Sequence, residues 1–302
     1  MKKILCAVLL TVLLLPLLPS ALAESAETVT FKKLTVAADA EAIDLGKVKV
    51  GADEYKAFFK FLDKLPNLKK VDMFATEITR RRIEQLAERY PDVEFGWTMI
   101  VGNHRVRTDA TAFSTRHSDQ ASRHGNEDFS VLKYCKNLQA LDIGHNKVTD
   151  LSFLYDLPHL KVLIVVDNRF RDITPIASLK ELEYLELFFN DVRDVTPLRD
   201  MTSLIDLNIC YNRIQDLSPL EGLTGLERLW ISHSNSHNVT IPMDEEQVNR
   251  LVEALPDTQV DSTARTAVEG GWRDHPHYQV VLRMFAEDGQ YEPFPDEDAT
   301  AE

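Results

Sequence analysis

A 22-residue repeat is the feature that most constrains this chain. Leucines recur at positions 138, 160, 182, 204 and 226, and each begins the phrase Leu-x-x-Leu-x-aliphatic. In the first four copies an asparagine follows at the ninth position of the repeat. These asparagines are Asn146, Asn168, Asn190 and Asn212, whereas the fifth copy has Ser234 there. A fixed period of this length is the signature of stacked repeats, so the chain is predicted to form a solenoid.

The repeat also predicts the structure of each rung. Alternate leucines of a short strand point inward, and stacked strands form a parallel sheet that no single repeat could stabilise alone. The asparagine amide can satisfy backbone groups that the following bend leaves unpaired. Residues 172–176, 194–198 and 216–220 repeat one phrase that contains proline, which favours short 3₁₀ turns on the outer side.

The 22-residue spacing and this phrase, Asp-aliphatic-Ser/Thr-Pro-aliphatic, resemble the leucine-rich repeats of bacterial internalin-like surface proteins. The resemblance covers about residues 136–235. It implies an α/β leucine-rich repeat solenoid with a curved parallel sheet, helical divergent flanking repeats and a C-terminal helical cap. It also implies a secreted recognition module without enzymatic activity.

The ends of the chain give the predicted domain organisation. Residues 1–23 have two lysines, an apolar run and the triplet Ala21-Leu22-Ala23, which is typical of a cleaved secretory signal peptide. Residues 24–135 are predicted to hold divergent repeats with helices and a hairpin insertion, 136–240 the regular repeats, and 241–302 a divergent repeat, a helical cap and an acidic tail. The protein is therefore expected to be secreted or surface-associated, with no membrane span in the mature chain.

The N-terminal flank carries its own periodic signals. Helices are expected over residues 53–62 and 80–89, and a hairpin over 97–108 that turns at Gly102-Asn103. Residues 114–128 are polar and are expected to form a loop. Inward-facing pairs that continue the stack are predicted at Ile43 and Leu45, Val71 and Met73, and Val93 and Phe95.

The C-terminal flank predicts a lid. After Pro276, the side chains of Tyr278, Val281, Leu282 and Phe285 fall on one helical face, with Trp272 beside them. A solenoid exposes apolar core at both ends, so this helix is expected to close the C-terminal end of the stack.

Composition excludes several functions. The net charge of −14 argues against a general nucleic-acid binder. Only Cys135 and Cys210 lie beyond the predicted leader, and their places in the repeats predict two separate thiols. His275 and His277 lack the spacing of a metal site, and residues 130–133 match S-x-x-K without the other motifs of penicillin-binding enzymes. No cofactor, metal or catalytic residue is predicted.

The predicted binding surface is the concave face, where positions three, five, seven and eight of each repeat point outward. Aromatic side chains ringed by charges match the composition of binding hot spots. The candidate ligand-binding residues are Val162, Ile164, Val166, Tyr184, Glu186, Phe188, Asp206, Asn208, Arg228 and Trp230. This surface is predicted to bind a protein or a glycan.

The sequence leaves several alternatives open. A flank could fold over the aromatic patch, or the position-eight aromatics Phe189 and Tyr211 could tuck back under the asparagine turn. The solenoid could instead serve as a rigid structural spacer of the cell envelope. An enzyme hidden in the flanks would need a pocket of converging ionisable groups near residues 97–130.

Overall fold

The computed structural model describes residues 27–116, 123–232, 244–263, 271–286 and 289–295. The predicted signal peptide and the acidic tail from Asp296 lie outside the described residues. Among the helices described, none has the length and apolar character needed to cross a membrane.

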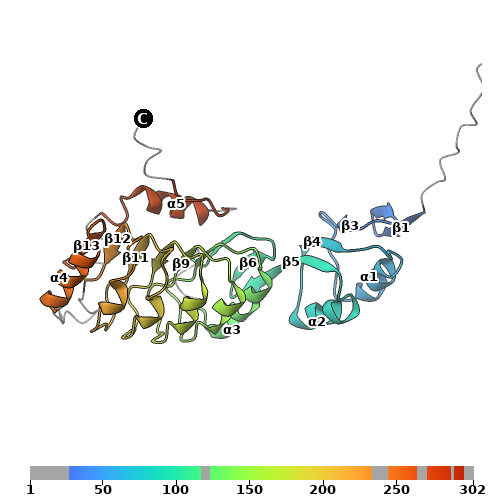
Figure 1. Cartoon of the computed structure of the whole chain (residues 1–302). Helices are drawn as coiled ribbons and strands as arrows, with labels where there is room; N and C mark the ends of the chain where they lie inside the picture. The colour runs from blue at the N-terminus through green and yellow to red at the C-terminus, as the bar shows by residue number, and fades with distance from the viewer. Residues whose placement is uncertain (1–26, 117–122, 233–243, 264–270, 287–288, 296–302) are drawn as a thin grey trace, which may run out of the picture.

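A seven-stranded parallel sheet runs through the regular repeats (Figure 1). Its strands follow chain order: β7 (Ala112–Ser114), β8 (Ala140–Asp142), β9 (Val162–Ile164), β10 (Tyr184–Glu186), β11 (Asp206–Asn208), β12 (Arg228–Trp230) and β13 (Gln259–Asp261). Neighbouring regular strands align at the predicted offset of 22 residues, as Leu163, Leu185 and Leu207 do. The predicted α/β leucine-rich repeat solenoid is confirmed.

The repeat pattern missed the first and last strands of this sheet. Phe113 in β7 aligns with Leu141, and Val260 in β13 aligns with Leu229. Neither strand belongs to a full Leu-x-x-Leu phrase, because β7 has only one large inward side chain and β13 follows a longer helical unit. The predicted loop over 114–128 is therefore wrong at both ends: it begins at the last residue of a strand and ends inside the helix Asn126–Phe129.

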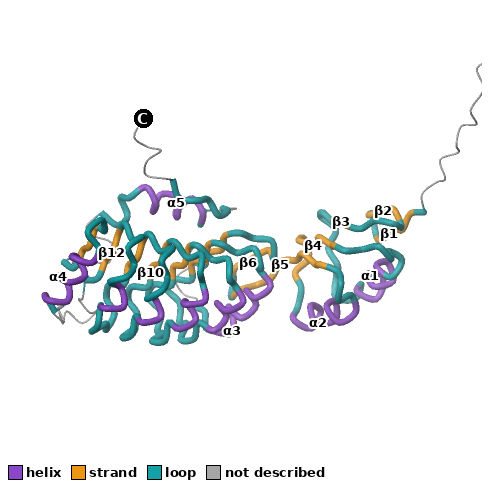
Figure 2. The backbone as a smooth tube through the Cα atoms, viewed as in Figure 1, coloured by secondary structure: helices purple, strands orange, loops and turns teal. Residues whose placement is uncertain are grey.

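Short helices line the convex side of the solenoid (Figure 2). They are α3 (Asn126–Phe129), η1 (Ser130–Tyr134), η2 (Ser152–Asp156), η3 (Thr174–Ser178), η4 (Thr196–Leu198), η5 (Ser218–Leu220) and α4 (Glu245–Ala254). The aspartate of the repeated phrase precedes three of the 3₁₀ turns, where Asp172 Oδ1 accepts from the backbone N–H of Thr174 at 2.8 Å. Hydrogen bonds from Thr174 also hold the pKa of Asp172 below its usual value. The predicted 3₁₀ turns are confirmed.

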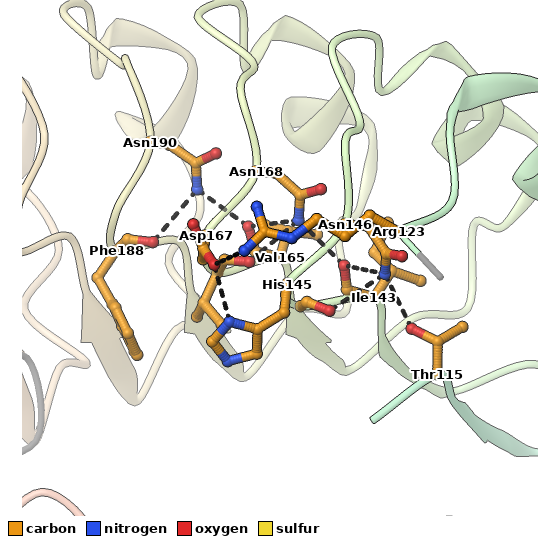
Figure 3. Close-up of polar contacts among 12 residues, drawn as sticks. Thr115, Arg123, Ile143, His145, Asn146, Val165, Asp167, Asn168, Phe188 and Asn190 are labelled. Atoms are coloured by element: carbon orange, nitrogen blue, oxygen red, sulfur yellow. Dashed lines mark hydrogen bonds and ion pairs between the residues drawn. The ribbon is translucent and has the colours of Figure 1, made fainter. Parts of the chain in front are cut away.

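The core lies between the sheet and these short helices. The five leucines that begin the repeats are at most 2% exposed. The asparagines after the strands bind two rungs at once: Asn168 Nδ2 donates to the carbonyl of Ile143 at 3.0 Å and to that of Val166 at 3.1 Å. Figure 3 shows Asn146, Asn168 and Asn190 in the same position on successive rungs. The predicted asparagine ladder is therefore present.

An N-terminal unit precedes the seven-stranded sheet. It contains a hairpin of β1 (Thr28–Phe31) and β2 (Leu34–Ala37), and a four-stranded sheet of β3 (Ala42–Asp44), β4 (Lys70–Glu77), β5 (Glu94–Val101) and β6 (His104–Arg107). The predicted helices are present as α1 (Tyr55–Leu62) and α2 (Arg80–Arg89). The predicted hairpin is β5–β6, and Gly102 at its turn has a φ of 61°.

One predicted register in this unit is wrong. Ile43 aligns with Val71 as expected, but Val71 aligns with Phe95 and not with Val93. The two-residue shift keeps the same face inward because side chains alternate along a strand. Phe95 and Trp97 thus occupy the buried positions that the sequence pattern assigns to Val93 and Phe95.

The C-terminal helix α5 (Pro276–Met284) does not sit at the end of the stack. Figure 1 shows it running across the concave side of the sheet, on the face opposite the short helices. The helix prediction is confirmed, but its predicted place is wrong. Its predicted apolar face is wrong at Leu282, which is 39% exposed, whereas Val280 and Met284 are buried. The sheet face offers an apolar cluster that includes Tyr184, Phe188 and Trp230, whereas β13 and α4 already add a further unit at the end of the solenoid.

The asparagine ladder gives a first testable prediction. Asn168 Oδ1 accepts from the backbone N–H of Val148 at 2.9 Å, whereas Asn190 Oδ1 has no partner in the part of the chain that the structure describes. Asn168→Ala leaves more buried backbone groups unpaired, so it should lower the free energy of unfolding by about 2–4 kcal/mol. Asn190→Ala should cost less. Urea unfolding of both variants measures the order, and a larger loss for Asn190→Ala would contradict this account of the ladder.

Candidate binding surface beneath the C-terminal helix

The structure brings the predicted site residues together on one face of the seven-stranded sheet. They come from β9 to β12 and the residues just after them, and their side chains point away from the leucine core. All ten are nevertheless buried, with exposures of at most 5%. An open concave face is therefore absent from the described structure, and the alternative that a flank covers it is the one the structure shows.

The covering segment consists of residues 271–286 and 289–295, here called the C-terminal cover. Trp272 lies between two rungs, with ring centroids 5.7 Å from Tyr184 and 5.1 Å from Trp230. The apolar side of α5 completes the contact. The buried apolar residues of the cover in this cluster are Trp272, Val280, Val281, Met284 and Phe285.

A buried ionic group joins the cover to β11 and β12. Asp206 Oδ1 accepts from Nε of Arg228 at 2.6 Å, and its Oδ2 lies 2.7 Å from Nδ1 of His277 in α5. Arg228 Nη1 donates to the carbonyl of Trp272 at 3.0 Å. Burial alone would raise the pKa of the Asp206 carboxyl, but the hydrogen bonds from His277 and Arg228 outweigh it and lower that pKa. The cover is thus held by hydrogen bonds to Asp206 and Arg228 as well as by apolar contact.

A second buried carboxyl lies one rung away. Glu186 Oε1 accepts from Nε1 of Trp272 at 2.8 Å and from the hydroxyl of Tyr184. Burial raises the pKa of Glu186, although these two hydrogen bonds partly offset the shift. Burial also raises the pKa of the Tyr184 hydroxyl well above its usual value. The indole of Trp272 is therefore fixed at both its apolar face and its polar nitrogen.

The concave face is covered and not accessible, contrary to the prediction. The cluster of Tyr184, Phe188 and Trp230 on the sheet would expose apolar area that water disfavours, and the chain's own amphipathic helix removes it. Sequence reasoning identified the surface and its covering helix separately. Composition links the two: the carboxyls of the sheet face can accept hydrogen bonds, and Trp272 and His277 of the facing segment can donate them.

Position eight of each repeat lies at the edge of the covered patch. His145, Asp167, Phe189 and Tyr211 all have positive φ, between 46° and 60°. The backbone N–H of each of these residues still donates to a carbonyl of the next rung, as that of His145 does to Val166 at 2.8 Å. Phe189 and Tyr211 stack with centroids 4.2 Å apart and are half-buried against the covered patch, so they pack on the concave side and not back under the asparagine turn.

The other half of this edge is polar. Nδ1 of His145 lies 2.9 Å from Oδ2 of Asp167, and Arg123 approaches the same oxygen at 3.4 Å (Figure 3). These side chains are partly exposed and pair with one another along the rungs. The edge therefore changes from charged to aromatic along the solenoid.

A groove of about 1180 Å³ opens beyond the C-terminal end of α5. Its lining comes from β6, β7 and the cover, and includes Arg105, Phe113 and Phe285. It lies in the region where a hidden enzyme would need its pocket. Its charged groups pair with neighbours, Arg107 with Asp109 at 2.6 Å and Arg105 with Glu77, and so do not converge on one point.

The remaining chemical candidates are accounted for by local contacts. Ser130 Oγ donates to the carbonyl of Glu127 at 2.7 Å. In the described ranges, no three His, Cys, Asp or Glu side chains form a metal-binding group. Cys135 and Cys210 are both free and buried, which confirms two separate thiols. Burial raises the pKa of Cys135 to about 12 and that of Cys210 to about 11, so both are poor nucleophiles.

Comparisons with known proteins find a family match within the repeats. A family model of leucine-rich repeats (two copies) matches residues 136–178. A search of curated proteins finds no match to this chain. Similar solved structures include an internalin from Listeria monocytogenes, at 19% identity and a TM-score of 0.40 over 69% of this chain and 66% of that one.

Two further structures are similar in the same way. Internalin C2 of the same bacterium is 20% identical with a TM-score of 0.34, over 69% of this chain and 70% of that one. A leucine-rich repeat protein from Leptospira interrogans is 21% identical with a TM-score of 0.44, over 67% of this chain and 50% of that one. The matched region thus spans 66% of the first internalin and half of the Leptospira protein. The family match within the repeats agrees with the leucine-rich repeat fold that the sheet register shows.

The buried carboxyl of Glu186 gives a prediction about pH. Its folded-state pKa is raised, so its ionisation opposes folding: the protein loses stability as pH rises from the unfolded value of about 4.3 through the folded value. Glu186→Gln keeps an oxygen for Trp272 and Tyr184 and cannot ionise. The variant should melt about 2–4 °C higher at pH 7, the shift expected for about 1 kcal/mol in a domain of this size.

Melting curves from pH 4 to 8, followed by circular dichroism, provide the measurement. Glu181→Gln is the matched control, because this side chain is 49% exposed and pairs with His159 at the surface. The control should change little at any pH. A lower melting temperature for Glu186→Gln than for the wild type at pH 7 would show that the ionised carboxylate stabilises the cover.

Proposed function

We propose that this chain is a non-enzymatic extracellular recognition module that binds a protein partner through its concave face when the C-terminal cover opens. A leucine-rich repeat solenoid is a protein-binding module in general. The observation that carries the proposal is that the predicted site residues already bind a helical segment, the C-terminal cover, through the aromatic contacts of Trp272 and the contact of His277 in α5 with Asp206. A helical occupant favours a protein partner over a glycan.

The free energy needed to open the cover determines the apparent affinity for a partner. Each fully buried side chain of the cover contributes roughly 1.5–3 kcal/mol, so the open state is rare. A partner that needs the open state binds with its intrinsic affinity reduced by that small population. Changes that weaken the cover without touching the sheet should therefore increase binding.

Two neighbouring residues of α5 provide a matched pair for this test. Val281 is 1% exposed and faces the sheet, whereas Leu282 is 39% exposed on the outer side of the same helix. Val281→Asp places an unpaired charge in the contact and should open the cover. Leu282→Asp adds the same charge in solvent and should leave the cover closed.

The experiment probes an array of surface proteins and glycans with the wild type, the two helix variants and a third variant, Phe188→Ser combined with Val281→Asp. Val281→Asp should raise the signal on particular proteins by about tenfold or more, the effect of about 1.4 kcal/mol. The combined variant should lose that gain, and Leu282→Asp should match the wild type. Circular dichroism confirms that each variant is folded.

The same array separates the proposal from a structural spacer. The buried ionic group between α5 and β11 favours a permanently closed, rigid solenoid. A spacer predicts identical profiles for all folded variants. Identical profiles would therefore overturn recognition through the concave face, and a signal confined to glycans would replace the protein partner with a sugar.

A further inference from the structure

The covered concave face shows which chemistry its partner must carry. Three features of the C-terminal cover meet the sheet: an indole, an imidazole and an apolar helical face. Trp272 donates to Glu186, His277 contacts Asp206, and Val281 lies among the aromatic side chains. These contacts define two polar positions, Glu186 and Asp206, on a largely apolar floor.

One polar atom of this floor is not satisfied by the cover. Arg228 is 2% exposed, and its Nε and Nη1 are bonded to Asp206 and to the carbonyl of Trp272. Its Nη2 is buried, and within the described ranges of the chain it has no hydrogen-bond partner. The guanidinium lies over the ring of Trp272, with Cζ 4.4 Å from the ring centroid, but this contact gives Nη2 no acceptor. A partner that offers an acceptor would therefore pair more completely with Arg228 than the cover does.

The cover is also suited to exchange. Phe285, at the end of α5, lines both the covered patch and the open groove of about 1180 Å³. A second segment could therefore make contact with Phe113 of β7 in the groove before the cover leaves. The covered face and the groove form one continuous surface.

We propose that the covered concave face is a helix-exchange site, whose partner is an amphipathic segment that carries an indole donor for Glu186 and an acceptor for Arg228 Nη2. This inference rests on the proposed function and names the partner's chemistry. A partner with that acceptor binds more tightly than the cover itself, because it satisfies a donor to which the described part of the cover offers no acceptor. Glu186 and Arg228 are then the specificity-determining residues.

The probe is a synthetic peptide of residues 271–295 with a fluorescent label. Binding to the full chain carrying Val281→Asp is followed by anisotropy, with Leu282→Asp as the control and Trp272→Ala as a second opened variant. The peptide should bind both opened variants and should bind the control at least about tenfold more weakly, because the closed cover competes. A Trp272→Phe peptide, which lacks the indole N–H, should bind about tenfold more weakly than the natural one.

A substitution scan of the peptide tests the acceptor. Each position is replaced in turn by glutamine or glutamate, and the peptides are measured against Val281→Asp and against Val281→Asp with Arg228→Lys. At least one substitution should tighten binding about tenfold to the first chain and not to the second, since lysine keeps a charge for Asp206 but lacks the second guanidinium nitrogen. Failure of the natural peptide to bind either opened variant, with both folded, overturns the exchange site.

The peptide experiments and the array test different claims. A scan with no improving substitution overturns the acceptor and leaves the array result untouched. An array without protein partners overturns the extracellular role even when the peptide binds. Light scattering of the Val281→Asp chain without added peptide measures self-association. Oligomers of mixed size would show that the covered concave face binds the cover of a second copy, and would overturn a foreign partner.

Discussion

The backbone register between rungs is the constraint on which the rest of this structure depends. Each strand of the regular repeats bonds to the next with an offset of 22 residues, so residues that share a position in the sequence repeat share a row in space. The asparagine side chains secure this register from the side, since each donates across two rungs. A column of leucines thereby becomes a continuous core, and a column of outward residues becomes a continuous surface.

The composition of that outward surface then determines how the chain ends. Tyr184 and Phe188 on one rung and Trp230 two rungs further on create an apolar area that water disfavours. Asp206 and Arg228 within it need polar partners once water is excluded. The C-terminal cover supplies both an apolar face and the polar atoms of Trp272 and His277. Buried charges that are paired in this way fix one position of α5, while Nη2 of Arg228, unpaired within the described residues, limits how strongly it is held.

Much of this could be predicted from the sequence because its periodicity maps directly onto space. The strand positions, the asparagine ladder, the two N-terminal helices and the Gly102-Asn103 hairpin all follow from local pattern. Strands β7 and β13 could not be predicted because their inward residues lack the leucine phrase. The place of α5 could not be predicted either, since an amphipathic helix shows which face is apolar but not which surface receives it.

The ten candidate residues show the same division. Their common face follows from alternation along each strand, whereas their burial depends on a contact such as that between Glu186 and Trp272, 86 residues apart. No short-range pattern encodes that pairing. Binding of a separate ligand by these residues stays a prediction, and it requires that the cover leave the sheet while the repeats remain folded.

Amide hydrogen exchange of the wild-type chain tests this requirement most directly. The account predicts that the amides of α5 exchange through a local opening, with a free energy below that of global unfolding, while those of β9, β10 and β11 exchange only when the whole solenoid unfolds. Equal protection of α5 and these central strands, under conditions where exchange reports stability, would show that the cover never opens alone. The concave face would then be a closed part of the core and not a binding surface.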